Sequence, residues 1–130
     1  MIVRMPVSHT RPLTVSDLDL VVRHRKGMFR EMGRPEEELA AMSAGFRPWL
    51  EPRLRDGSYL GWVIEQEGAA VAGVGMMVLD WPPHPYHPED SRRAYILNMF
   101  VEPEHRGTGL ARITSNRCFS DLRQERGSGW

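Results

Sequence analysis

The chain has a single cysteine, Cys118, among its 130 residues. One thiol cannot form an intramolecular disulfide, and no second cysteine completes a CxxC pair for zinc, which favours a reducing compartment. Residues 1–10 lack the apolar run of a signal peptide, and no stretch of eighteen apolar residues predicts a membrane span. We therefore expect a cytoplasmic protein that does not engage a membrane.

The chain also lacks a net charge, because 17 basic residues balance 17 acidic ones. No long-range field favours a polyanion, and the densest basic cluster, at residues 23–26, falls in a helical pattern where such residues usually form a solvated face. No nucleic-acid partner is predicted. The composition, 41% hydrophobic and 26% charged, is that of a folded domain, and the length suits one domain over residues 1–130.

Two helices are predicted first. Apolar residues recur at spacings of three and four over residues 14–33 and again over residues 35–57, with a Thr or Ser cap before the first helix and a glycine ending each. Pro48 and Pro52 each remove a hydrogen bond from the second helix, so we expect a kink or a fresh short helix there. The helical methionines, Met28 among them, are expected to fill the core.

The pattern then changes to that of strands. Residues 59–66 and 69–79 read as a hairpin with a tight turn, and residues 94–101 as a further strand. Four prolines in residues 80–93 exclude a central strand and predict an ordered surface loop. From Leu110 onward the chain looks helical. The fold class is α/β (α+β).

The most informative stretch runs from an apolar strand through a proline-containing turn into a glycine-spaced helix start at residues 94–111. Gly107 and Gly109 would let the backbone approach a bulky anion, and the free N–H groups at a helix N-terminus bind phosphate oxygens. A Walker A loop would need Gly-Lys-Ser/Thr, and a dinucleotide fingerprint would need a third glycine in an early βαβ unit. Neither is present.

The segment VEPEHRGTGLA, residues 101–111, resembles the acetyl-CoA signature of the GNAT N-acetyltransferase superfamily. The resemblance implies a mostly antiparallel sheet flanked by helices, and an upstream order of strand, two helices and hairpin. About the whole chain fits the N-terminal two-thirds of that fold, so we expect an incomplete, C-terminally truncated domain without the final strand, helix and hairpin. Glu104 departs from the Gln or Arg that usually opens the motif and leaves the backbone cradle intact.

The resemblance also assigns the cosubstrate, acetyl-CoA, to particular residues. Phe100 and Val101 resemble strand positions that pair with the pantetheine arm, and Asn98 and Met99 would lie beside the thioester. The pyrophosphate would be held by the main-chain N–H groups of Arg106, Gly107, Thr108, Gly109, Leu110 and Ala111, with added charge from Arg106.

The reaction that the resemblance implies is direct attack by an amine of a small molecule or peptide, with a base for the amine and an acid for the thiolate. The candidate catalytic residues are Tyr95 and Asn98, and these two, like Glu65, His84 and His87, would contribute only through water. The tyrosine that usually serves as the acid lies beyond the end of this chain.

The same resemblance places acceptor contacts at Glu31 and Arg34, in the turn between the helices, and at Tyr86 in the proline-rich loop. A solvated turn is the alternative for the first two residues.

Several alternatives stand beside these assignments. An H-x-x-H pair at His84 and His87 suggests a metal, but it lacks a regular scaffold, and no metal is predicted. A catalytically inactive remnant or interaction module that at most binds CoA is the alternative function. The strand at residues 94–101 would have an open edge, so a homodimer covering it is expected. Cys118 reads as a helix residue without a catalytic role.

Overall fold

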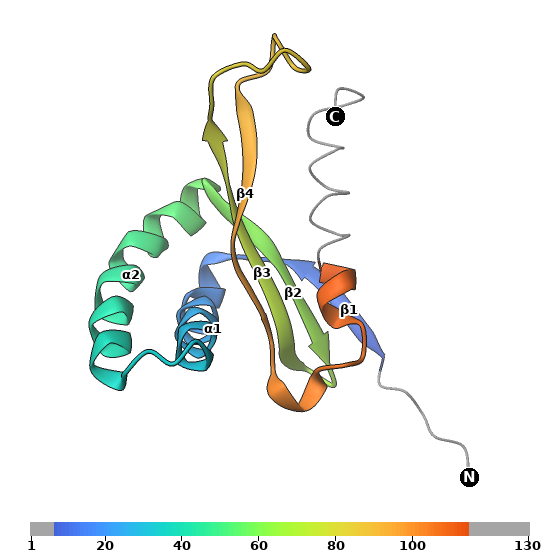
Figure 1. The fold of residues 1–130 in the computed structure, drawn as a ribbon. Helices are drawn as coiled ribbons and strands as arrows, with labels where there is room; N and C mark the ends of the chain where they lie inside the picture. Colours follow the sequence, from blue (N-terminus) through green and yellow to red (C-terminus); the bar gives the residue numbers. More distant parts are fainter. Residues whose placement is uncertain (1–6, 115–130) are drawn as a thin grey trace.

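The protein, seen in a computed structural model that describes residues 7–114, is built around one four-stranded antiparallel sheet (Figure 1). The strand order follows the chain, so each strand pairs with its neighbour in sequence. The elements are β1 (Ser8–Pro12), the 3-10 turn η1 (Val15–Asp17), α1 (Leu18–Glu31), α2 (Glu36–Asp56), β2 (Tyr59–Gln66), β3 (Ala69–Asp80), β4 (Arg92–Val101) and the 3-10 turn η2 (Pro103–His105).

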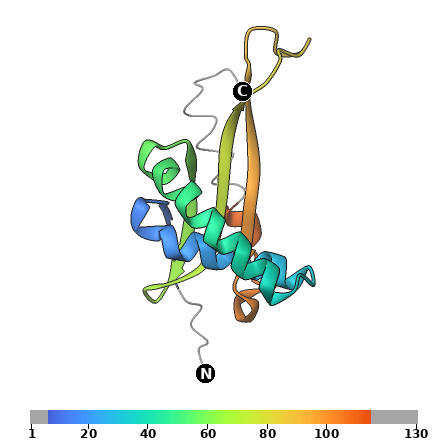
Figure 2. The same ribbon diagram turned by 90° about the vertical axis from the view of Figure 1, so that its left-hand side faces the viewer.

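Both helices cover one face of the sheet, as the two ribbon views show (Figures 1 and 2). Leu18, Val21 and Leu50 from the helices pack with Tyr59 of β2 on this face. The helical residues 110–114 lie on the opposite face, where Leu110 packs on Ile64, Val71 and Ala72. Side chains of a strand alternate between the two faces of a sheet, so the same strands supply apolar residues to the cluster on each face.

The first two predicted helices are confirmed, and of the two outcomes predicted at Pro48 and Pro52 the second helix shows a bend (Figure 1). The side chain of Asp17 accepts a hydrogen bond from the N–H of Thr14 at 2.9 Å, which caps the 3-10 turn η1 that leads into α1, and Gly33 follows α1 with φ of 87°. The second helix does not restart: α2 runs through Pro48 and Pro52 and curves along its length (Figure 1). A bend in the helix makes room for the proline ring and for the missing N–H, so the helix continues.

The hairpin is confirmed, and its turn has the backbone that a two-residue connection requires. Glu67 and Gly68 both have positive φ, 53° and 79°, which matches the right-handed twist of the strands. The strand before the first helix was not located from the residues, because β1 is short and mostly polar. It forms by pairing with β2.

A β-bulge interrupts β4. Asn98 pairs with Gly75 and Ile96 pairs with Met76, so Leu97 is one extra residue in the strand. Within residues 7–114, the outer edge of β4 pairs with no other strand. The expected second copy at this edge stays a prediction.

The proline-rich loop, residues 81–91, joins β3 and β4 at one end of the sheet, far along β4 from residues 106–111 (Figure 1). His84 and His87 form an isolated bridge there, and the His84 ring stacks on Tyr86 at 5.2 Å. Residues 7–114 contain no group of three potential metal ligands. None of the helices described is long and apolar enough to cross a membrane. Cys118 lies outside the described residues.

An ion-pair cluster ties β1 to the start of the first helix. Arg11 donates to both carboxylate oxygens of Asp17, at 2.7 and 2.8 Å, and also pairs with Glu65 of β2. Asp17 is only 7% exposed. Burial raises the pKa of Asp17, but the hydrogen bonds from Arg11 and Thr14 outweigh it, so the pKa lies below its usual value.

Replacing Arg11 with alanine should lower the free energy of unfolding by about 1–3 kcal/mol at pH 7, because it leaves the Asp17 carboxylate buried without its cation. A carboxyl with a lowered pKa stabilises the fold above its unfolded pKa, about 3.9, and this contribution is lost as the pH falls through the folded value. Urea titrations at pH 7 and pH 3 should therefore show a smaller Arg11→Ala effect at pH 3. An equal effect of Arg11→Ala at pH 7 and pH 3 would contradict the conclusion that Arg11 stabilises the ionised carboxylate of Asp17.

Candidate functional site

A cleft runs along the end of β4, between α1 and the loop that follows the strand. Its volume is about 420 Å³. Eight of the nine residues predicted for the cosubstrate line it, and only Thr108 does not. The lining consists of Met28, Glu31, Met99, Phe100, Val101, His105, Arg106, Gly107, Gly109, Leu110 and Ala111.

The glycine turn gives the cleft a floor of backbone groups. Gly107 and Gly109 have φ of 81° and 84°, in the left-handed region that side chains disfavour. Among the described residues, the main-chain N–H groups from Gly107 to Leu110 make no hydrogen bond. The N–H of Arg106 donates to the carbonyl of Pro103 at 3.3 Å, so the unpaired donors begin at Gly107 rather than at Arg106.

The side chain of Thr108 forms a hydrogen bond within the turn. Its hydroxyl donates to the carbonyl of His105 at 2.7 Å, which closes the loop behind the cleft. The Thr108 side chain is therefore used locally, and its N–H remains unpaired among the described residues.

Arg106 spans the cleft. Its Nε donates to the carbonyl of Val101 at 2.9 Å, and its Nη2 pairs with Glu31 at the end of α1. The guanidinium also lies 5.5 Å from the ring centre of Phe100. Both partners of the Arg106–Glu31 pair are more than 40% exposed, so the pair contributes little stability and can be exchanged for another anion.

Two cleft residues were not predicted. Met28 lines the cleft instead of filling the core, because it lies one turn before Glu31 on the same side of α1. The i, i+3 spacing of Met28 and Glu31 was the available signal. His105 joins the lining from η2, and nothing in the sequence pattern distinguished it.

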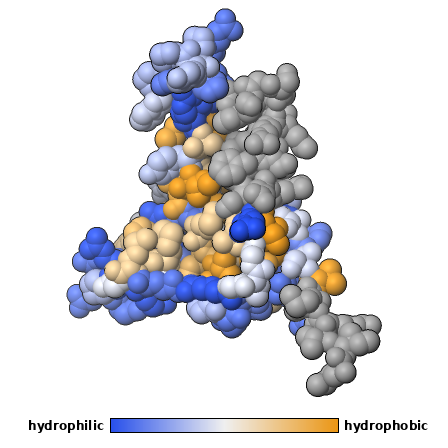
Figure 3. All heavy atoms as spheres, turned by 45° about the vertical axis from the view of Figure 1, so that its right-hand side comes forward, coloured by the Kyte–Doolittle hydropathy of each residue, from blue (hydrophilic) through white to orange (hydrophobic). Residues whose placement is uncertain are grey.

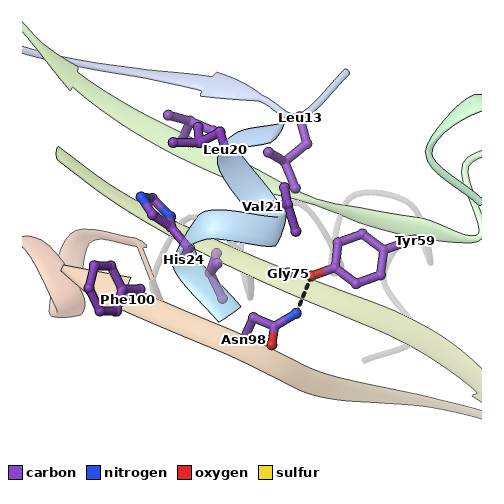
Figure 4. Close-up of a pocket in the computed structure, with 11 residues that line it drawn as sticks. Leu13, Leu20, Val21, His24, Tyr59, Gly75, Asn98 and Phe100 are labelled. Atoms are coloured by element: carbon purple, nitrogen blue, oxygen red, sulfur yellow. Dashed lines mark hydrogen bonds between the residues drawn. The ribbon is translucent and has the colours of Figure 1, made fainter. Parts of the chain in front are cut away.

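Asn98 lies next to the bulge with its side chain turned away from the cleft, towards the helices. Its amide donates to the hydroxyl of Tyr59 at 2.6 Å and accepts from Arg25 of α1 at 2.6 Å. Figure 4 shows the Tyr59 ring lying over Gly75 to reach Asn98. A Cβ at Gly75 would lie 1.8 Å from the Tyr59 oxygen, so this contact depends on the glycine.

A small cavity of about 20 Å³ lies beneath this bond, with room for about one water molecule. His24 of α1 lines it, 5% exposed and 5.0 Å from the Phe100 ring (Figure 4). Burial lowers the pKa of His24, although the nearby Glu102 carboxylate opposes this shift. His24 is therefore a neutral side chain that packs α1 against β4.

The remaining predicted site residues lie away from the cleft. Tyr95 is 56% exposed and pairs with Met77, three residues before Asn98. Arg34 is exposed and pairs with Glu38 at 3.6 Å. Tyr86 is 83% exposed in the proline-rich loop. Glu65 of β2 forms an ion pair with Arg11 of β1. Of the predicted acceptor residues, the structure brings only Glu31 to the cleft.

The face of the sheet opposite the helices is apolar, because the buried side chains of Trp62, Val74 and Met76 pack there with Met99 and Ile96 of β4. In the view of Figure 3, hydrophobic residues also gather across the middle of the molecular surface, below the largely hydrophilic proline-rich loop. β4 therefore packs on both faces, while its outer edge borders the cleft.

The Acetyltransferase (GNAT) family model matches residues 22–128. A GCN5-related N-acetyltransferase from Ralstonia eutropha JMP134 is 53% identical, with a TM-score of 0.86 over 93% of this chain and 78% of that chain. A "predicted acetyltransferase with acetyl-CoA" from Clostridium acetobutylicum is 24% identical, with a TM-score of 0.78 over 92% and 75%. No curated protein matched the chain.

The chain belongs to the GNAT acetyltransferase family. It is a GNAT-type N-acetyltransferase domain, as the motif at residues 101–111 predicted, and acetyl-CoA is the cosubstrate of that family. A more distant structure, the PaiA N-acetyltransferase of Thermoplasma acidophilum in complex with coenzyme A, shares the fold at 12% identity, with a TM-score of 0.66 over 92% of this chain and 74% of that chain.

Proposed function

We propose that this chain binds acetyl-CoA in the cleft along β4 and transfers the acetyl group to an amine of a small molecule or peptide. One observation carries the proposal: eight of nine residues chosen from the sequence for CoA line a single cleft. Those residues come from β4 and from the turn after it, so one ligand lying along the strand would touch both.

The pyrophosphate would lie on the glycine turn. The N–H groups from Gly107 to Leu110, which have no partner among the described residues, supply donors. Gly107 and Gly109 adopt positive φ and carry no side chain that would block the ligand. Arg106 would exchange Glu31 for a phosphate oxygen, with which a guanidinium also forms a charge-assisted hydrogen bond. In this proposal Arg106 also releases the carbonyl of Val101.

The pantetheine arm would follow the outer edge of β4 from Val101 towards the bulge. The carbonyl of Val101 already points to the cleft, since Arg106 reaches it there. Alternate residues of a strand present their backbone groups to the same edge, so Met99 is the next pairing position. The thioester then reaches the bulge at Leu97 and Asn98.

At the bulge, a main-chain N–H would polarise the thioester carbonyl as negative charge develops during attack. The Asn98 side chain is held by Tyr59 and Arg25, so we propose that Asn98 contributes through its backbone. Tyr95, three residues along the strand and 56% exposed, would contribute to the reaction only through water.

Calorimetry with CoA tests the proposal. We expect a saturable heat for the folded protein, with Kd in the micromolar range typical of cosubstrate sites. Circular dichroism in the same buffer establishes that the protein is folded. No heat at millimolar CoA would defeat the binding proposal.

The alternative of a CoA-binding domain without turnover is favoured by one observation: the side chain of Asn98 is fully engaged by structural partners. Thiol release separates the two possibilities. An enzyme releases CoA at a rate that depends on the amine, whereas a binding domain gives the heat of binding and no amine-dependent thiol. The single cysteine fits a cytoplasmic location for either.

A further inference from the structure

A second pocket lies on the helix side of β4, next to the bulge. It has a volume of about 260 Å³ and is lined by Arg25, Phe46, Trp49, Met77 and Leu97. Leu97 is the extra residue of the bulge, two positions before Met99 in the CoA cleft. The pocket and the cleft are therefore consecutive along one strand, and they meet where the thioester is proposed to lie.

The pocket is apolar except for one cation. The rings of Phe46 and Trp49 stack at 5.8 Å, and Met77 and Leu97 complete the wall. Flat rings and a thioether favour an apolar group of aromatic size. This wall would not favour a polyamine or a sugar, because their polar groups would lose water without gaining partners.

The cation is Arg25, whose guanidinium lies 5.0 Å from the ring centre of Phe29 and 4.9 Å from that of Phe46. Within residues 7–114 its hydrogen bonding is limited to one contact, from Nη1 to the side-chain oxygen of Asn98, and it has no carboxylate partner. Its Nε is shielded from solvent and has no hydrogen-bond partner in this described part of the chain. A half-buried guanidinium without an anion is the feature that a ligand carboxylate would neutralise.

Resting on the proposed function, we infer that this pocket is the acceptor site and that its substrate is a free α-amino acid with a large apolar side chain. The side chain occupies the wall of Phe46, Trp49, Met77 and Leu97, and the carboxylate pairs with Arg25. One carbon joins the carboxylate to the amine, so a carboxylate at Arg25 keeps the amine beside Asn98 and the bulge.

The step balances with acetyl-CoA as the only co-reactant. The neutral amine attacks the thioester carbonyl carbon, the new C–N bond forms, and the C–S bond breaks. The amine proton leaves to water and the thiolate takes up a proton. The products are the N-acetylamino acid and CoA.

The test measures thiol release with acetyl-CoA and L-phenylalanine, and calorimetry of L-phenylalanine added to the protein–CoA complex. Phenylalaninamide and phenethylamine keep the ring and the amine but lack the carboxylate. We expect L-phenylalanine to be preferred over both by at least about tenfold in kcat/KM and in affinity, because the two analogues lack the carboxylate that forms a charge-assisted pair with Arg25. Glycine and L-aspartate should be poor acceptors.

Arg25→Gln should erase the preference for L-phenylalanine over its amide, and Arg25→Lys should retain part of it. The matched control is Arg55→Gln, an exposed arginine on α2 that pairs with Glu51 at i, i+4. Thermal melts check that the variants are folded. Equal use of L-phenylalanine and phenylalaninamide by the unchanged protein, or an unchanged preference in folded Arg25→Gln or Arg25→Lys, would overturn the inference while CoA binding stands. Absent CoA binding would instead overturn the proposed function and this inference with it.

Discussion

Replacing Gly107 or Gly109 by valine is expected to weaken CoA binding on the order of 100-fold or more while leaving the protein folded. A Cβ at either position meets no protein atom within 4 Å, so it points into the space where the ligand is proposed to lie. The φ of both residues is positive, so valine also turns the neighbouring N–H groups away from their present direction. Losing two charge-assisted hydrogen bonds accounts for the factor.

The matched control is Gly57→Val. Gly57 has φ of 80°, and a Cβ at this position would also meet no atom within 4 Å, but the residue ends α2 and does not line the cleft. All three variants should lose a similar 1–2 kcal/mol of stability from the strained backbone, about the cost of a left-handed residue. Calorimetry with CoA should then separate them. If Gly57→Val weakened binding as much as the other two, the cradle would be wrongly placed.

Replacing Asn98 by alanine is expected to lower the free energy of unfolding by about 2–4 kcal/mol. The change leaves the buried Tyr59 hydroxyl without its partner, removes the acceptor of Arg25, and opens a gap beside the bulge. Desolvation raises the pKa of Tyr59, and the bond to Asn98 opposes that shift, so the hydroxyl stays protonated at neutral pH. Urea denaturation at pH 7 measures the loss.

Tyr59→Phe removes the same bond from the other side and should cost less, because it leaves fewer unpaired groups. The double variant should be less destabilised than the sum of the two single changes, since the residues share one hydrogen bond. Tyr86→Phe, on an 83% exposed ring, is the control and should change stability by less than about 0.5 kcal/mol. Additive effects of Asn98→Ala and Tyr59→Phe would show that the bond contributes nothing.

Much of the fold followed from local patterns. The helix boundaries near Thr14, Gly33 and Gly57 and the turn at Glu67 and Gly68 depend on caps and on positive φ, which are properties of short segments. Local patterns failed at β1 and left two outcomes open in α2. β1 needs the edge of β2 to form, and α2 continues past Pro48 and Pro52 by curving.

In the candidate site, too, some residues could be predicted from a local motif and others could not. Most residues of the CoA cleft fall in one segment, from Met99 to Ala111, so a motif could identify them, whereas Met28 and Glu31 come from α1. The second pocket draws residues from both helices, from β3 and from β4. No sequence motif joins Arg25, Phe46, Trp49 and Leu97, because only the packing of α1 and α2 on the sheet brings them together.

The sequence by itself determined the family, the cosubstrate and the glycine turn after β4, because each depends on residues adjacent in the chain. The tertiary structure decided what Asn98 and Arg25 do. Seventy-three residues separate them, and their hydrogen bond forms only when α1 lies across the sheet. The same packing turns Asn98 away from the cleft, adds Met28 to it, and leaves Arg25 as a cation facing an apolar pocket.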